Sequence, residues 1–153
     1  MFYLEVNQLI IFCFKVRFID LCNNRLVKLT NGTLRGLQQA EMVNLSGNKI
    51  VSIQSEAFTG FHHLKELDLS YNKLKMVKNG AFRGCLTLHT LKLKSAGISL
   101  IQPNAFDDFV NLRFLDISDN KLTIPDALFR LGTSPSLTNL ILSGNDLSNI
   151  TTG

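Results

Sequence analysis

The stretch LKELDLSYNKL, residues 64–74, alternates apolar and polar residues and carries an asparagine near its end. Leu67 and Leu69 are separated by a single polar residue, which is the period of a strand with one buried face. Glu66 and Asp68 then face solvent, because successive strand side chains point to opposite sides. A strand this short cannot bury its leucines alone. The stretch therefore predicts a unit that depends on neighbours of the same kind.

The same pattern recurs about every 24 residues along the chain. Its asparagines fall at 24, 48, 72, 120 and 145, and the missing member of this column is Ala96. Repetition at this period indicates stacked units that share one continuous core. The six segments are VRFIDLCNNRL (16–26), AEMVNLSGNKI (40–50), LKELDLSYNKL (64–74), LHTLKLKSAGI (88–98), LRFLDISDNKL (112–122) and LTNLILSGNDL (137–147).

The second half of each unit has apolar residues at wider spacing, which indicates irregular turns or a short helix that closes the coil. Phe58, Phe82 and Phe106 recur there, and a second apolar column contains Leu29, Ile53, Val77 and Ile101. Together these residues resemble the longer form of the extracellular type of leucine-rich repeat, over roughly residues 16–150. The resemblance implies an α/β solenoid, a right-handed superhelix of about six 24-residue repeats with a parallel β-sheet on its concave face.

The asparagine column has a structural role in that family, where it bonds backbone groups as the chain leaves the strand. By resemblance, such a ladder is formed by Asn24, Asn48, Asn72, Asn120 and Asn145. The alternative is five turn residues chosen for their tolerance of left-handed backbone. Ala96 interrupts the column, so we expect the backbone around it to be looser or to hold a water in place of the amide.

Composition, charge and motifs argue against several classes of function. The chain is 45% hydrophobic with a net charge of +4 that is spread along its length, so we do not expect nucleic acid as the primary partner. Cys13, Cys22 and Cys85 are too scattered for a zinc site, and His62–His63 lacks a third ligand in register. No catalytic motif occurs. We therefore expect neither an enzyme nor a cofactor.

The chain divides into an irregular segment or degenerate repeat at 1–15 and a repeat domain at 16–153, with units starting near 16, 40, 64, 88, 112 and 137. The apolar run Leu9–Phe14 is too short for a signal peptide core or a membrane span. We expect any membrane anchor to lie outside this chain. The cysteine-rich caps that the extracellular family has at both ends are missing, so we also expect the chain to be part of a longer receptor ectodomain or a truncated gene model.

The outward side of the predicted strands is the candidate binding surface. Basic and aromatic side chains gather there, and we expect them to dock a protein, glycan or microbial ligand on the concave face or flank. These residues are Lys65, Tyr71, His89, Lys92, Lys94, Arg113 and Phe114. In the alternative interpretation, Lys92 only pairs with Asp68 and Asp116, which contributes little at a surface.

Three N-x-S/T triplets, at Asn31, Asn44 and Asn149, favour a secreted or lumenal protein. LDLSYNKL, with AF later in the unit, looks most like the ectodomains of Toll-like receptors. That resemblance implies innate immune recognition and signalling on the extracellular side of a cell-surface or endosomal membrane, with a possible dimer through the parent receptor. A secreted or cell-surface adhesion or matrix protein uses nearly the same repeat and is the alternative; the triplets argue against an intracellular scaffold.

Overall fold

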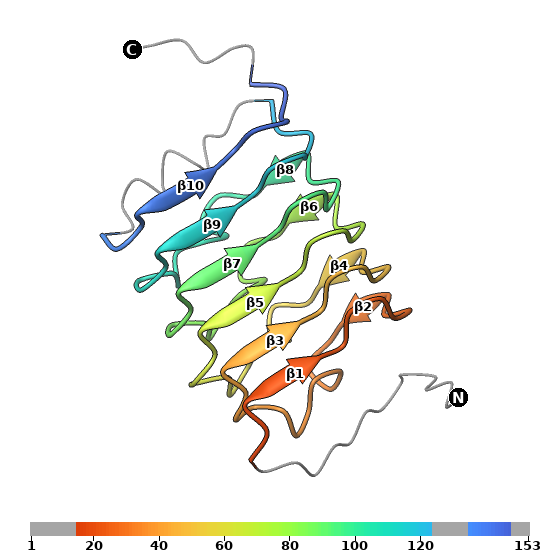
Figure 1. Ribbon diagram of the computed structural model, residues 1–153, viewed down its shortest axis with the longest axis vertical. Coiled ribbons are helices and arrows are strands. Elements are labelled where there is room, and N and C mark those ends of the chain that lie inside the picture. Colours follow the sequence, from red (N-terminus) through yellow and green to blue (C-terminus); the bar gives the residue numbers. More distant parts are fainter. Residues whose placement is uncertain (1–14, 124–134, 148–153) are drawn as a thin grey trace.

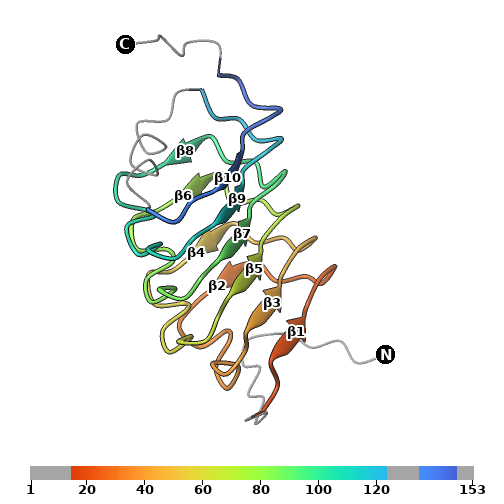
Figure 2. The ribbon, with the colours of Figure 1, turned by 60° about the vertical axis from the view of Figure 1, so that its left-hand side comes forward.

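The computed structural model describes residues 15–123 and 135–147 and shows a parallel-strand solenoid (Figure 1). Two rows of strands run along it, and Figure 2 shows them on different sides of the coil. The first row is a six-stranded sheet of β1 (Phe18–Asp20), β3 (Met42–Asn44), β5 (Glu66–Asp68), β7 (Thr90–Lys92), β9 (Phe114–Asp116) and β10 (Asn139–Ile141). The second row holds β2 (Lys28–Leu29), β4 (Ser52–Ile53), β6 (Met76–Val77) and β8 (Leu100–Ile101).

The register of the large sheet follows the sequence period. Ile19 lies opposite Val43, and Leu67 lies opposite Leu91, so each strand pairs in parallel with the one 24 residues away. The pairing continues to β10, where Leu140 lies opposite Leu115. The predicted parallel stacking is therefore confirmed, and equivalent positions of neighbouring coils are about 4.8 Å apart.

The core fills the space between the two rows of strands. Its inward side chains are buried from β1 to β9, as Leu67, Leu91 and Leu115 illustrate, whereas the equivalent Leu140 of β10 is 41% exposed. Burying one such side chain contributes roughly 1.5–3 kcal/mol. Behind them the rings of Phe82 and Phe106 stack with centroids 6.1 Å apart, and Phe82 also lies 5.3 Å from Phe109. Since each ring contacts the next coil, the core is continuous along the solenoid.

The expected helical part of the α/β description is not found, because the described residues contain no helix. The chain returns from the second row through successive four-residue turns, in which an N–H donates to the carbonyl three residues earlier. Examples are Ala57 N–H to Gln54 C=O and Phe61 N–H to Phe58 C=O. Gly60 follows in the left-handed region with φ 87°, which ends any helical path. Turns, and not helices, therefore close each described coil.

Candidate binding surface on the six-stranded sheet

A column of side-chain caps runs across the sheet where each strand ends. In four coils an Asp or Asn oxygen accepts a hydrogen bond from the backbone N–H two residues further on, at 2.9–3.0 Å. The four residues are Asp20, Asn44, Asp68 and Asp116. These local bonds direct each side chain back onto its own turn. For Asp20, the bond from the Cys22 N–H lowers the pKa of the carboxyl below its ordinary value.

Lys92 occupies this column in the fourth coil and cannot make such a cap. It lies in register with Asp68 on one side and Asp116 on the other. Nevertheless, no ion pair within 4.0 Å joins Lys92 to any described residue, while one oxygen of each of these aspartates accepts the N–H of its own cap. The pairing proposed as the alternative is not formed, and the Lys92 ammonium remains available on the sheet.

Two other cations of the candidate surface are already engaged. Lys65 Nζ lies 2.8 Å from Glu41 Oε2, and Arg17 holds the second oxygen of Glu41 at 2.7 Å. The bond from Lys65, followed by the two positive charges, holds the pKa of Glu41 below its ordinary value. Lys94 Nζ lies 3.2 Å from Asp119 Oδ2, and that contact raises the pKa of Lys94.

Asp119 is a surface residue that the sequence analysis did not identify. It lies 25 residues after Lys94, which is one period plus one position, so the repeat spacing could have revealed the pair. With Lys65 and Lys94 engaged, Lys92 and the exposed Arg113 are the cations of the proposed set without a carboxylate partner among the described residues.

The remaining members of the proposed set lie close to these cations. His89 directly precedes β7 and is half-buried, and its Nδ1 is buried without a hydrogen-bond partner in the described part of the chain. Phe114 is also half-buried and lies opposite Thr90 in register. The structure thus places Lys92 and Phe114 on the paired strands β7 and β9, and His89 and Arg113 directly before these strands.

Tyr71 stands just outside the sheet in an unusual backbone conformation. Its φ is 57°, and its side chain is 57% exposed. The whole column shares this left-handed conformation, at Asn23, Gly47, Tyr71, Ser95, Asp119 and Gly144. Asn, Asp and Gly suit it, whereas an aromatic residue there costs roughly 1–2 kcal/mol. Because each described coil has a left-handed residue at this position, the conformation belongs to the repeat, and what sets Tyr71 apart is an aromatic side chain in a column that mostly holds Asn, Asp or Gly.

We expect Tyr71→Gly to leave the free energy of unfolding unchanged or to raise it by up to about 1 kcal/mol, because glycine adopts positive φ without strain. Lys73→Gly is the matched control: Lys73 is exposed and has ordinary backbone, so it should lower stability by roughly 0.5–1 kcal/mol. Urea denaturation of the three proteins measures both effects. Equal losses in the two variants would contradict the strain at Tyr71.

In each coil the residue of the asparagine column directly follows the left-handed residue. Asn48, Asn72 and Asn120, in the middle of the column, are buried. Asn48 Oδ1 accepts the Leu26 N–H of the preceding coil at 3.0 Å, while its Nδ2 donates to Leu21 and Leu45 carbonyls at 2.9 Å. Asn72, Asn120 and Asn145 make the equivalent bonds. Asn24 is exposed, and its recorded bonds go to the carbonyls of its own turn. Each buried amide thus joins two coils.

Ala96 is fully buried, and its carbonyl oxygen replaces the missing amide oxygen. The Leu74 N–H of the preceding coil donates to this carbonyl at 2.9 Å. The Ala96 N–H in turn donates to Asn120 Oδ1 at 3.1 Å. Ala96 itself is therefore bonded on both sides.

The predicted glycosylation asparagines and the cysteines lie in different environments. Asn31 is exposed on a turn, whereas Asn44 lies in β3 with its Oδ1 bonded to Ser46; Asn149 and Cys13 fall outside the described residues. Burial raises the pKa of the Cys85 thiol to about 12, which keeps it protonated and unreactive. Within residues 15–123 and 135–147, no cluster of three metal-ligating side chains was found.

Comparison with known proteins agrees with this geometry. A family model described as leucine rich repeat matches residues 15–74 and 62–122. The chain belongs to the leucine-rich repeat family. A search of curated proteins found no match. Where the structure is described, it contains no helix long and apolar enough to cross a bilayer.

A solved structure extends the similarity of this leucine-rich repeat chain to Toll-like receptors. The crystal structure of the TLR13–ssRNA13 complex matches with a TM-score of 0.84 and 30% identity over 91% of this chain. The chain spans 20% of the length of that solved chain. Since that relative was solved with a single-stranded RNA, the comparison gives no support to the expectation that nucleic acid is not a primary partner.

Proposed function

We propose that this chain is part of the ligand-binding ectodomain of a Toll-like receptor that acts in innate immune recognition. The observation that carries the proposal is the 30% identity over 91% of the chain to a Toll-like receptor solved with its ligand. In this proposal the chain lies on the extracellular or lumenal side of a membrane. The anchor, the signalling domain and a receptor dimer belong to the longer parent protein.

The proposed ligand is a polyanion that contacts the sheet across β7 and β9. Lys92 and Arg113 supply charge that no described carboxylate neutralises. Tyr71 supplies an exposed ring on which a base or sugar can stack. A single-stranded RNA combines both features and is the ligand class to test first. A sulfated glycan shares the anionic chemistry and is the competing outcome.

The double variant Lys92→Glu/Arg113→Glu should bind single-stranded RNA at least about tenfold more weakly than the wild type, a change of about 1.4 kcal/mol. Reversing two contacts should also lower the dependence of log K on log salt by about two. Fluorescence anisotropy with a labelled 20-nucleotide RNA, at several salt concentrations, measures both quantities.

Tyr71→Gly should weaken binding through loss of stacking while leaving the salt dependence unchanged.

Lys28→Glu/Lys49→Glu is the control, since it makes the same change in net charge at exposed positions outside β7 and β9. An equal loss of affinity in this control would show non-specific attraction and would refute the site. Stronger binding of heparin than of RNA, with the same response to the variants, would assign the site to a sulfated glycan.

The identity of the parent protein is tested by the transcript. A membrane span and a Toll/interleukin-receptor-type domain encoded in frame after residue 153 would support the receptor. A cysteine-rich cap followed by a stop codon would contradict it and favour a secreted adhesion or matrix protein.

A further inference from the structure

The second row of strands is interrupted at its centre. β2 pairs with β4, and β6 pairs with β8, but β4 and β6 do not pair although they are neighbours in the row (Figure 1). The large sheet has no such break, because β3, β5 and β7 pair in register at the same levels. The interruption is therefore confined to one side of the coil.

Backbone bonds show which groups lose their partners. The Val51 and Gln54 N–H groups donate to Val27 and Leu29 carbonyls at 2.9 Å. One period after β6, Ser99 and Gln102 make the same bonds to Lys75 and Val77. The residues at these positions in the intermediate coil are Lys75 and Lys78. Their N–H groups make no backbone bond to the described residues of the β4 coil.

The cause lies at the interrupted asparagine column. In four other coils, the N–H two residues after the column position donates to an Asn oxygen of the next coil; these donors are Leu26, Ile50, Ile98 and Leu122. Leu74 donates instead to the main-chain oxygen of Ala96. The backbone then turns sharply, with Lys75 at φ 58° and the Met76 N–H bonded to the Leu74 C=O at 2.6 Å. At this turn the Lys75 N–H makes no backbone bond to the described residues of the β4 coil.

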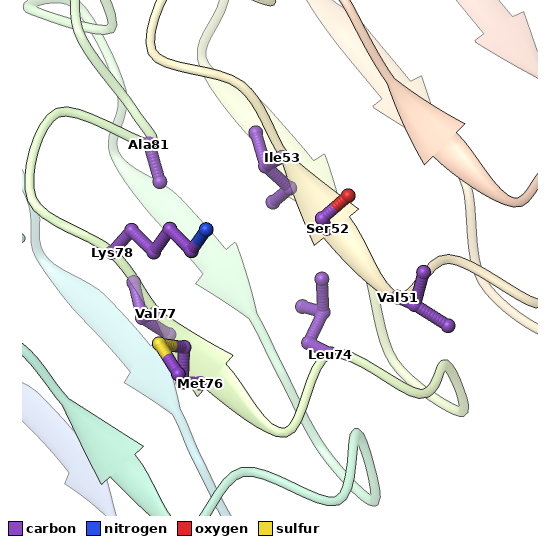
Figure 3. Close-up of a pocket in the computed structure, with 8 residues that line it drawn as sticks. All are labelled: Val51, Ser52, Ile53, Leu74, Met76, Val77, Lys78 and Ala81. Atoms are coloured by element: carbon purple, nitrogen blue, oxygen red, sulfur yellow. The ribbon is translucent and has the colours of Figure 1, made fainter.

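A small cavity marks the separation. Val51, Ser52 and Ile53 line one side, and residues from the β6 coil line the other, including Met76, Val77 and Lys78 (Figure 3). Its volume is about 20 Å³, which is room for one water molecule. Val51 and Met76 remain 41% and 36% exposed beside it. The two pairs of strands are thus joined at this level by fewer bonds and by incomplete packing.

We infer that the β4–β6 junction is a local hinge of the solenoid, created by alanine in place of asparagine at position 96. The junction opens at lower free energy than the rest of the second row, since fewer bonds and contacts must break there. The intact large sheet keeps the two halves together, so opening changes the bend of the solenoid without separating its coils. This inference does not depend on the proposed ligand.

Amide hydrogen exchange by NMR tests the hinge in the full chain. In the wild type, the Lys75 and Lys78 amides should exchange at least about tenfold faster than Val51, Gln54, Ser99 and Gln102, their equivalents in neighbouring coils. Protection equal to that of these four amides would overturn the hinge. In Ala96→Asn, the Lys75 and Lys78 amides should become as protected as their equivalents, and the Lys75 φ should become negative.

Gly97→Asn is the control, because it adds the same amide one residue away, where no atom lies within 4 Å of an added Cβ. Gly97 has a φ of 72°, and Asn is among the side chains that best tolerate this left-handed conformation. The Gly97→Asn variant should leave Lys75 and Lys78 exchanging rapidly. Unchanged exchange in a folded Ala96→Asn variant would overturn the role of Ala96.

If that variant does not fold, Lys75→Gly tests the same geometry. It should raise the urea midpoint, whereas Ser99→Gly, one period later, should lower it. Equal shifts would overturn the inferred turn.

Discussion

Asn120→Ala is expected to lower the free energy of unfolding by about 3 kcal/mol or more. The Asn120 side chain is only 7% exposed and makes five hydrogen bonds to backbone groups. Its oxygen is the acceptor for the N–H groups of both Ala96 and Ile98. An unsatisfied buried donor costs roughly 1–3 kcal/mol, and alanine at 120 would leave two of them. Since the preceding member of the column is Ala96, two adjacent coils would then both lack the asparagine side chain.

Asn24→Ala is the matched control for this experiment. Asn24 occupies the same column, but it is exposed, and its recorded bonds reach only the carbonyls of Leu21 and Cys22. Water can replace those bonds, so the loss should be under about 1 kcal/mol. Urea denaturation followed by circular dichroism measures both variants. Similar losses at positions 24 and 120 would show that the column acts through local turn preference and not through bonds between coils.

Phe82→Ala is expected to cost roughly 3–5 kcal/mol, the range for truncating a buried aromatic ring. Phe82 is 1% exposed and lies at the centre of the ring column, with centroids 6.2 Å from Phe58 and 5.3 Å from Phe109. Removing its ring would leave a cavity between the coils on either side. Since turns and not helices form this part of each described coil, little regular backbone is present to resist the change.

Phe18→Ala provides the comparison, because Phe18 is exposed on β1. Its truncation should change stability by about 0.5 kcal/mol or less. Thermal and urea unfolding of both variants would measure the difference. A loss at Phe82 no larger than that at Phe18 would show that the ring column does not stabilise the solenoid.

The 24-residue period predicted the strands and their register, because an inward leucine at a fixed spacing allows one way of stacking. The return segments were harder to predict. Phe58 and Phe61 have a spacing that suits either a helix or turns. Gly60 lies between them with a left-handed backbone, which is compatible with turns and not with a helix. Periodicity of apolar residues does not report that backbone angle.

The repeat period placed the residues of the candidate surface on the sheet, but it could not predict which of their charges are paired. The sequence placed Lys92 between Asp68 and Asp116. It could not show that each of these carboxylates accepts a hydrogen bond from the backbone N–H two residues later. At Ala96 the sequence predicted a looser backbone or a water in place of the amide, which stays a prediction. It could not show that a main-chain oxygen takes over as acceptor, because every residue carries that group and no pattern of side chains reveals its use.

The asparagine column gives the solenoid a direction. The oxygens of Asn48, Asn72, Asn120 and Asn145 each receive a bond from a residue 22 to 24 positions earlier, as Asn48 does from Leu26 and Asn120 from both Ile98 and Ala96. A substitution in this column therefore removes support from the coil that precedes it along the chain. A variant at an asparagine of this column should therefore weaken the coil about 24 residues earlier in the chain. The altered residue and the weakened segment lie in successive coils, and the effect runs toward the N-terminus.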